Sequence, residues 1–400
     1  MAQDTLEQLL IDRQRHIAAG ATTPLPTQYP VNQLAAALHP ETQYLKITKV
    51  VTHDATARSF YLAPDPTKGT QHLAYFQAGQ YLSVRITIDG SVVTRPYAIR
   101  SAPQSALNDE YILTIKRVPQ GFVTPYIFNH WRVGTTVTAS APMGTLTINP
   151  LRDQSHIVAI AGGSGITPFY AMASAILDGT EDADLTILYG SRDHHHILLG
   201  DELNAISTQT DRVHLVNVLS DEDYPGYETG FITADVIRRH LPAGPVSVFI
   251  CGPDALYQFA QKELTAFNLP AGRIRHELSG NYGDPRQAPD YPDSPANASV
   301  QTFRLTVSVR GQTQTIPARA DESVLTAMER AGIHAPSACR SGECGVCRAR
   351  VVSGQLFVPN QDDHRRLADK TYGYVHTCLA FPLSDCELDV PVHALANQFG

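Results

Sequence analysis

The sequence has little charge of either sign and no excess of positive charge. Lys and Arg number 31 against 39 Asp and Glu, which gives a net charge of −8 over 400 residues. This balance argues against a nucleic-acid-binding protein and against a polybasic membrane anchor, since both depend on clustered basic residues. Cysteine is scarce as well, and six residues are too few for a disulfide-stabilised scaffold of this length. Gly and Pro, 27 each, exclude collagen-like and low-complexity chains.

The sequence also lacks a recognisable targeting or membrane-spanning segment. Its first 16 residues carry charges throughout and lack the apolar core of a signal peptide. Residues 154–177 contain no Asp, Glu, Lys or Arg, but glycines, Ser, Thr and Pro interrupt their middle. That composition indicates a strand, a turn and a helix rather than a transmembrane helix. We therefore expect a soluble, cytoplasmic protein that has no nucleic-acid or membrane partner.

The hydrophobic pattern predicts a multidomain protein. Residues 44–150 contain six short segments rich in β-branched and aromatic residues, typical of an antiparallel β-barrel, with one helix at 124–131. Residues 151–280 alternate continuous apolar strands with helices, which indicates an α/β domain whose parallel sheet is covered on both faces. Residues 281–301 contain four prolines and are predicted to form a semi-extended linker.

The remaining parts of the chain are a third compact region and an N-terminal extension. Residues 302–400 are predicted to form an α+β domain in which two strands turn at Gly311. A helix should follow, capped by Asp321 and ended by Gly332. Residues 1–43 begin with a possible short helix, and we assign them no function.

Four of the six cysteines form the most specific pattern in the sequence. Cys339, Cys344 and Cys347 follow the spacing C-x4-C-x2-C, and Cys378 comes after thirty further residues. This is the plant-type spacing of [2Fe–2S] ligands, in which two thiolates bind each iron. Structural zinc is the alternative, but it usually pairs two C-x2-C segments, and only one is present here. Cys386 alternates with apolar residues of an expected strand, which indicates a buried core residue.

A glycine-rich segment lies between an apolar strand and a helix. Residues 162–168 have the sequence Gly-Gly-Ser-Gly-Ile-Thr-Pro. Glycines let the backbone approach a pyrophosphate, which the N-terminus of a helix attracts. We expect Thr167 as the N-cap and Pro168 as the first helical residue. A glycine-rich turn alone is also consistent with a merely tight connection.

Two segments of the expected barrel carry residue types that suit a flavin. Arg95 and Tyr97 lie on one strand, where a guanidinium group binds phosphate and an aromatic ring supports the flavin. Residues 121–124 precede the helix of the barrel and offer backbone N–H groups to phosphates. Taken alone, these residues are equally consistent with ordinary strand positions.

Together these motifs resemble the ferredoxin–NADP reductase superfamily, in its oxygenase-reductase form with a C-terminal plant-type ferredoxin domain of β-grasp fold. The resemblance covers residues 44–400 and departs at Ala98, where the family pattern R-x-Y-S has a Ser near flavin N5. It implies that Cys251 lies beside the nicotinamide and that Glu277 is the acidic residue that ends the nucleotide domain. It further implies flavin contacts from Arg95, Pro96, Tyr97, Ala98, Thr114, Lys116, Gly121, Phe122, Val123 and Thr124. The implied pyridine-nucleotide contacts are Gly163, Gly165, Thr167, Ser191, Arg192, Cys251, Gly252 and Pro253.

The choice between NADH and NADPH depends on the residues after the second parallel strand. Arg192 suits a 2′-phosphate, but Asp193 and three histidines follow it, so we favour NADH. The run 194–196 also raises the question of a metal site. Adjacent side chains do not point the same way on a strand or a helix, so we expect a solvated loop instead.

The resemblance implies an electron relay from NAD(P)H to a flavin, FAD rather than FMN, and singly through the cluster to a partner oxygenase. Two alternatives remain: the same relay serving another metalloenzyme or a corrinoid protein, and a redox-sensing subunit without turnover. Electrons must leave near the cluster, so we expect an exposed docking face around Arg340, Ser341 and Glu343. The net charge of residues 302–400 is zero, which suits a ferredoxin domain tethered to its donor.

Overall fold

The structure is a computed structural model of the chain, and it divides into two units. It describes residues 2–20, 29–278, 283–292 and 299–391. The first unit, Met1–Leu38, contains helices α1 (Ala2–Ala18) and α2 (Pro30–Leu38). The second unit, His39–Gly400, contains all of the sheets among the described residues. Within these ranges, no helix is both long enough and apolar enough to cross a membrane.

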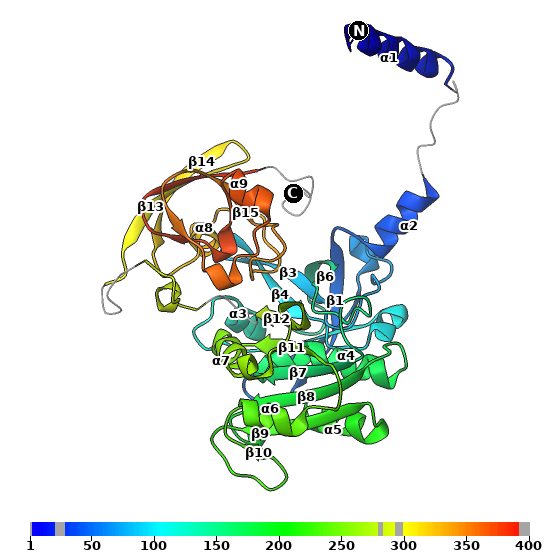
Figure 1. Cartoon of the computed structure of the whole chain (residues 1–400), viewed down its shortest axis with the longest axis vertical. Coiled ribbons are helices and arrows are strands. Elements are labelled where there is room, and N and C mark those ends of the chain that lie inside the picture. The colour runs from blue at the N-terminus through cyan, green and yellow to red at the C-terminus, as the bar shows by residue number, and fades with distance from the viewer. Residues whose placement is uncertain (1, 21–28, 279–282, 293–298, 392–400) are drawn as a thin grey trace. The chain divides into compact units, whose positions relative to one another are not determined.

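The second unit begins with a six-stranded antiparallel sheet, in the order β4-β3-β6-β1-β2-β5 (Figure 1). An isolated bridge between Ile99 and Leu113 brings the two edge strands together and closes the sheet into a barrel. Helix α3 (Val123–His130) packs on the barrel core, where Phe60 and Trp131 meet edge to face at 5.2 Å. The strands are β1 (Gln43–Thr52), β2 (Ala57–Pro64), β3 (Tyr81–Ile88), β4 (Ser91–Ala98), β5 (Tyr111–Lys116) and β6 (Thr136–Met143).

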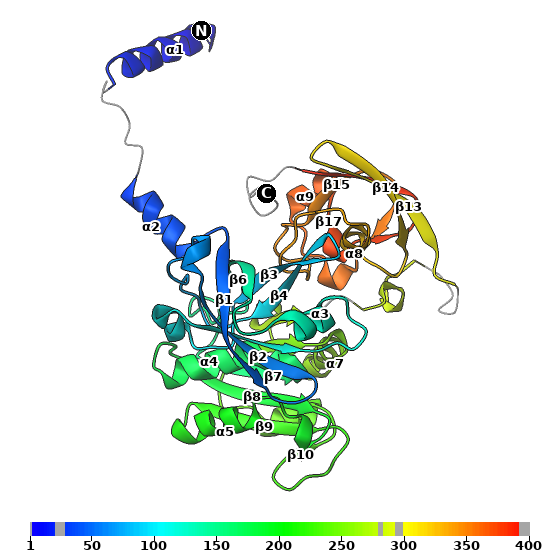
Figure 2. The same ribbon diagram turned by 180° about the vertical axis from the view of Figure 1, so that it is seen from behind.

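A parallel sheet follows, in the order β10-β9-β8-β7-β11-β12. Its central strands β7 and β11 are mostly apolar because both faces are covered. Ile157 and Ala159 pack on the face that α4 and α5 cover (Figure 2), whereas Val158 and Ile160 pack toward α6 and α7. The strands are β7 (His156–Gly162), β8 (Asp184–Ser191), β9 (Val213–Leu219), β10 (Glu228–Thr229), β11 (Ser247–Gly252) and β12 (Ile274–Leu278). The helices are α4 (Thr167–Leu177), α5 (Gly200–Gln209), α6 (Ala234–His240) and α7 (Asp254–Leu264).

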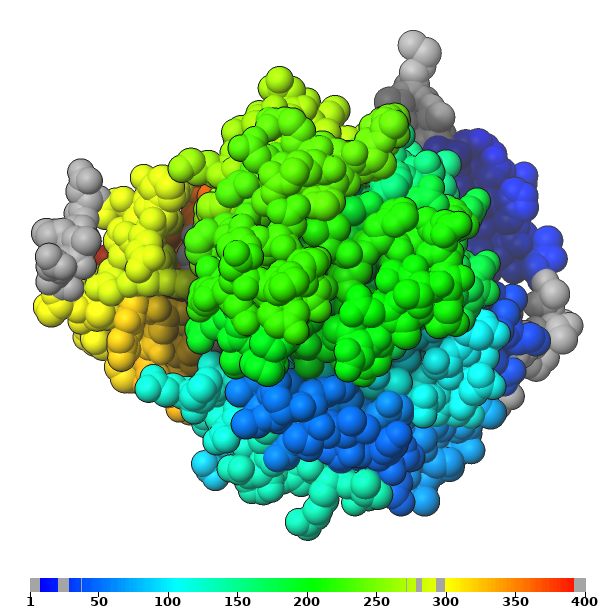
Figure 3. Space-filling view, turned by 90° about the horizontal axis from the view of Figure 1, so that it is seen from below, coloured from blue at the N-terminus to red at the C-terminus, as the bar shows by residue number. Residues whose placement is uncertain are grey.

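The barrel and the parallel sheet pack directly against each other. Figure 3 shows the green nucleotide domain seated on the blue and cyan barrel. A Cβ atom added to Gly79 of the barrel would lie 2.0 Å from the Leu146 carbonyl oxygen and 2.7 Å from Cε of Met172 in α4. Only glycine therefore fits at this contact, where φ is +98°.

The C-terminal sheet has the order β14-β13-β19-β15-β17, with β13 parallel to β19. Helix α8 (Val324–Arg330) packs on it through Val324, Leu325 and Met328. Cys386 is buried in the same core, as predicted. The strands are β13 (Thr302–Val309), β14 (Gln312–Arg319), β15 (Arg348–Ser353), β16 (Leu356–Phe357), β17 (Tyr374–His376), β18 (Phe381–Pro382) and β19 (Cys386–Val390), and α9 spans Leu367–Thr371.

Two details of this domain differ from the prediction. The hydroxyl of Ser323, not the carboxylate of Asp321, caps α8 by accepting from the Thr326 amide. Asp321 instead pairs with Arg319 at 2.6 Å. Part of the expected linker also belongs to this domain, because Tyr291 packs edge to face on Phe357 at 4.8 Å.

Candidate functional site: nucleotide loops and a cysteine loop at one junction

The glycine-rich loop adopts a geometry that only glycine permits. Gly163 has φ +55°, and a Cβ atom on Gly165 would lie 2.1 Å from the carbonyl oxygen of Cys251. The loop therefore lies against the end of β11, and it makes a short 3₁₀ turn before α4. Thr167 was predicted to be the N-cap, but it is the first residue of α4. Its hydroxyl donates to the Ser164 carbonyl at 2.9 Å.

Cys251 and Glu277 lie opposite each other at the carboxyl ends of β11 and β12. Burial raises the pKa of the Cys251 thiol well above its usual range, so the thiol is neutral. Burial, together with the negative charges of Glu343 and Cys339, raises the pKa of Glu277 to about 8. Gly252 completes the turn, since a Cβ atom there would lie 2.6 Å from Cδ2 of Leu256. Both predicted catalytic residues thus lie at the edge of the sheet where the glycine loop begins.

The predicted flavin strand, β4, faces the C-terminal domain. Arg95 pairs with Glu329 of α8 at 3.2 Å, and only 17% of the Arg95 side chain is exposed. Tyr97 packs on the barrel core, and Ala98 lies in register with Tyr81 of the neighbouring strand. The strand that carries the expected flavin contacts is therefore within reach of the cysteine-bearing domain.

Two other predicted flavin contacts, Thr114 and Lys116, have side chains that point to different places. The Thr114 side chain points into the barrel, where its hydroxyl lies 2.7 Å from that of Ser59, and Thr114 is 5% exposed. Lys116 reaches the glycine loop, since its Nζ lies 3.8 Å from the position of a Cβ atom on Gly163. Lys116 is therefore placed to meet a phosphate, whereas Thr114 supports the barrel core.

The start of α3 and the residues before it offer backbone N–H groups, rather than polar side chains, to an anion. Val123 is buried in the barrel core, and the Thr124 hydroxyl accepts from the Val118 amide at 2.9 Å. Phe122 is 52% exposed. The first amides of α3, beside Gly121, remain as the groups that could meet an anion.

The histidines after β8 are paired with acidic side chains. Ser191 is half-buried and Arg192 is exposed. His194 pairs with Glu222 at 2.8 Å, and His196 pairs with Asp193 at 2.7 Å. The His194 and His195 rings lie together, with centroids 3.7 Å apart, although adjacent side chains were expected to point in different directions.

The four predicted cluster ligands converge in the C-terminal domain. Cys339, Cys347 and Cys378 are 4–6% exposed, and Cys344 is half-buried. The sulfur atoms of Cys347 and Cys378 lie 3.3 Å apart. The amides of Ser341 and Cys344 each point at the Cys339 sulfur at 3.4 Å. Four thiols with inward-pointing N–H groups suit a [2Fe–2S] cluster, whose sulfurs accept such hydrogen bonds.

Residues outside the ligand set hold the cysteine loop in shape. The Thr377 hydroxyl donates to the Cys347 carbonyl at 2.8 Å, and the His376 ring bonds the Gly342 carbonyl. Gly342 has φ +81°, and a Cβ atom there would lie 2.9 Å from Cδ2 of Leu379. The loop therefore depends on glycine for both its backbone conformation and its packing.

The prediction of an exposed docking face around Arg340, Ser341 and Glu343 is wrong. The Arg340 side chain is 3% exposed and pairs with Glu329 at 2.7 Å, and Ser341 is also buried. Glu343 is half-buried, and burial and the Cys339 charge raise its pKa to about 7. These residues face the rest of the chain because the loop packs against the barrel, where the Ser83 hydroxyl donates to the Ala338 carbonyl at 3.4 Å.

The three predicted centres meet around Tyr81. Burial raises the pKa of Tyr81, and the charges of Cys339, Cys344 and Glu277 raise it further. A Cβ atom on Gly144 would lie 2.9 Å from the Tyr81 ring and 3.5 Å from a Glu277 carboxylate oxygen. The flavin strand, the nicotinamide edge and the cysteine loop therefore share one junction. Tyr81 and Glu329 were missed in the sequence because no local pattern marks them.

Family models match all three regions of the second unit. The oxidoreductase FAD-binding domain matches residues 43–148, and the oxidoreductase NAD-binding domain matches residues 159–262. The 2Fe-2S iron–sulfur cluster binding domain matches residues 307–383. The fold and the site thus define an NAD(P)H-dependent oxidoreductase with FAD and a [2Fe–2S] cluster.

Characterised relatives narrow this class. The chain is 29% identical over 351 residues to the ferredoxin reductase component of 3-ketosteroid-9-alpha-monooxygenase from Mycobacterium tuberculosis, covering 85% of this chain and 93% of the relative. It is 23% identical over 357 residues to the glycine betaine monooxygenase reductase from Chromohalobacter salexigens, covering 86% and 94%. Phthalate dioxygenase reductase has the same fold, with a TM-score of 0.61 and 24% identity over 88% of this chain and 98% of that structure. The chain therefore combines an FAD-binding, an NAD-binding and a 2Fe-2S domain, and over most of its length it is similar to reductase components of oxygenases.

Proposed function

We propose that this protein takes electrons from NADH and delivers them, one at a time, to a separate oxygenase component. The observation that carries the proposal is the shared junction: Tyr81 and Glu277 both lie beside Gly144, and the cysteine loop lies against β3 through the Ser83–Ala338 hydrogen bond. When bound, the flavin and the cluster together convert a two-electron hydride transfer into single-electron steps. The relatives named as monooxygenase reductases support an oxygenase as the acceptor.

In this proposal the chain's own residues position the nucleotide and shield it from water. Gly163 and Gly165 let the loop approach the pyrophosphate, and the helix dipole of α4 favours its negative charge. Cys251, as a neutral thiol, packs beside the nicotinamide without adding charge. Glu277 holds a proton at neutral pH and offers a hydrogen-bond donor to the same region.

The flavin contacts divide between backbone and side chains. Lys116 supplies positive charge for phosphates, and Tyr97 supplies an aromatic face. The Arg95 guanidinium pairs with Glu329 and holds the strand that carries Tyr97 against the C-terminal domain. Ala98 offers only its backbone amide where relatives with a Ser offer a hydroxyl. Thr114 contributes through the barrel core, since its hydroxyl bonds Ser59.

The preference for NADH is supported by acidic groups around Arg192. Asp193 follows it directly, and the Asp221 amide donates to the Arg192 carbonyl at 2.9 Å. Glu222 lies on the same loop and pairs with His194. Carboxylates here repel a 2′-phosphate. We also place the protein in the cytoplasm, where NADH is supplied and cluster thiols stay reduced.

The proposed functional modules are residues 44–150, 151–280 and 302–400, joined by the linker 281–301. The test uses the full chain, purified under argon with its flavin and cluster. NADH titration should bleach the flavin and then the cluster, and NADPH should do so at higher concentration. Adding an oxygenase component should reoxidise the cluster under argon and give hydroxylated product in air.

Three results would redirect the proposal. Reoxidation by a corrinoid protein but by no oxygenase would identify another acceptor. A loaded protein that NADH reduces but that shows no turnover with any acceptor would indicate a sensing subunit. Equal reduction by NADPH and NADH would contradict the preference for NADH but not the transfer of electrons to an oxygenase.

A further inference from the structure

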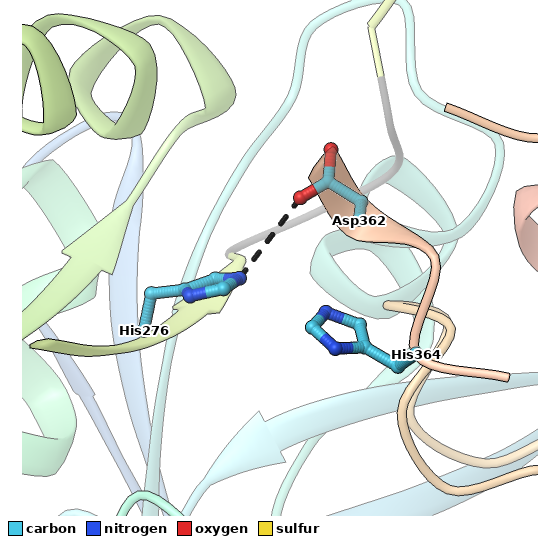
Figure 4. A group of neighbouring side chains, drawn as sticks. All are labelled: His276, Asp362 and His364. Carbon is cyan, nitrogen blue, oxygen red and sulfur yellow. Dashed lines mark ion pairs between the residues drawn. The ribbon is translucent and has the colours of Figure 1, made fainter. Parts of the chain in front are cut away.

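Three side chains outside the redox site converge where the nucleotide domain meets the C-terminal domain. His276 comes from β12, and Asp362 and His364 come from the loop that follows β16 (Figure 4). One ring nitrogen of each histidine and one carboxylate oxygen all lie within 4.8 Å of one another. The nearest measured approach is 4.0 Å, between Nε2 of His276 and Oδ1 of Asp362.

Asp362 is the least satisfied member of this group. The residue is fully buried, and neither carboxylate oxygen has a hydrogen-bond partner among the residues that the structure describes. Burying a carboxylate whose oxygens accept no hydrogen bond is costly unless a cation, a proton or a water molecule compensates it. One carboxylate oxygen points toward the His276 ring, and the His364 ring lies beside the pair, as Figure 4 shows.

The rings are held in position from outside the group. His276 stacks on Tyr257 with ring centroids 4.1 Å apart, and the His276 and His364 rings are 5.7 Å apart. Stacking restricts the plane of the His276 imidazole. By contrast, the half-buried His194 and the exposed His196 are each held by a separate carboxylate.

We propose that His276, Asp362 and His364 bind a divalent transition-metal ion, for which Zn²⁺ is the natural probe. Two imidazoles and one carboxylate are a typical three-residue set for zinc, with the fourth position left for water. Metal–ligand bonds of about 2.0–2.1 Å place tetrahedral ligand atoms about 3.3 Å apart. The observed spread of up to 4.8 Å therefore has to contract by about 1.5 Å at most, which side-chain rotation supplies.

The three proposed ligands come from two different domains. One ligand belongs to the nucleotide domain and two belong to the C-terminal domain, so the ion holds the two domains together. His276 also precedes Glu277 in β12, so the same ion fixes the end of the strand that faces Cys251. Bound metal therefore favours the closed arrangement in which the cysteine loop lies against the barrel.

The test measures zinc on the full chain with flavin and cluster in place. After dialysis against zinc-free buffer, Zn²⁺ is added, and bound metal is counted by elemental analysis. We expect one zinc per chain beyond the cluster iron, and zinc-edge X-ray absorption that shows nitrogen and oxygen ligands without sulfur. Zinc with sulfur ligands would mean occupation of the cluster cysteines and would overturn the proposal, as would no retained zinc.

Variants locate the ion. His364→Ala and the volume-conserving Asp362→Asn should weaken zinc binding at least about 100-fold, because losing a ligand exceeds the effect of losing an outer partner. His195→Ala, on an exposed turn, is the matched control and should bind zinc like the wild type. Unchanged iron, sulfide and flavin contents would show that the variants fold. Equal zinc loss in the control, or none in either site variant, would overturn the assignment.

Hydrogen exchange tests the coupling between the domains. Zinc should slow amide exchange in residues 360–366 of the wild type and should leave His364→Ala unchanged. Zinc bound through nitrogen and oxygen with no change in that segment would refute the role in closure.

Discussion

Glu329 joins two guanidinium groups from different domains, so replacing it should weaken the contact between the barrel and the C-terminal domain. Its carboxylate lies 3.2 Å from Arg95 of β4 and 2.7 Å from Arg340, next to the cluster ligand Cys339. Glu329→Gln keeps the shape and removes the charge. Two buried cations would then face each other with no anion between them.

The expected cost follows from the burial of the ion pair that spans the two domains. Arg95 and Glu329 are 17% and 7% exposed, so water screens their attraction little. Breaking a buried ion pair costs about 3–5 kcal/mol, and the amide oxygen of Gln recovers part of that as a hydrogen bond. We expect a net loss of about 2 kcal/mol in docking, which is about a 30-fold fall in the docking equilibrium constant.

Anaerobic stopped-flow measurement separates the two halves of the relay. With excess NADH, flavin bleaching should keep its wild-type rate in Glu329→Gln, whereas cluster bleaching should slow by up to about 30-fold. Glu387→Gln, an exposed position of β19, makes the same charge change and should leave both phases unaltered. An unslowed cluster phase in Glu329→Gln, at full flavin content, would refute the reasoning.

Three further changes test other parts of the site. Cys339→Ser should abolish the cluster absorption but leave flavin reduction by NADH intact; loss of both would show that the domains are not independent. Gly165→Ala places a methyl group 2.1 Å from the Cys251 carbonyl oxygen, so the loop must shift, and the KM for NADH should rise tenfold or more, about 1.4 kcal/mol. The pKa of Glu277 is raised to about 8, so the folded protein keeps a proton that the unfolded chain releases, and stability should fall as the pH rises from about 5 to 8. Glu277→Gln should flatten that slope in denaturant unfolding; an unchanged slope would show that another group titrates.

Local patterns predicted most of the elements and indicated that four cysteines would converge. The C-x4-C-x2-C spacing and the glycine loop are set by short-range geometry, so the cysteine loop and the turn at Gly165 could be located from the sequence alone. Helix α6 was missed because its seven residues are mostly polar and charged. The cap of α8 was misplaced since Asp321 and Ser323 are both good capping residues, and only the folded backbone decides between them.

Contacts between distant segments were beyond the reach of the sequence. Arg95 and Glu329 are 234 residues apart, and no spacing rule links them. The exposed docking face was wrong for the same reason, because the burial of Arg340 depends on where another domain lies. Thr114 shows the limit within one strand: its neighbours Leu113 and Ile115 are also buried, so simple alternation does not give its direction.

The closed cysteine loop also governs which molecules can withdraw electrons. With Arg340 and Ser341 covered by the chain's own barrel, bulky adventitious oxidants such as cytochrome c meet the half-buried edge of the loop at Glu343, Cys344, Gly345 and Val346. A partner protein that accepts electrons has to fit that narrow edge, or it has to bind the C-terminal domain while that domain is separated from the barrel. Selectivity then resides in the rate of opening, and variants that loosen the contact should leak reducing equivalents to unintended proteins.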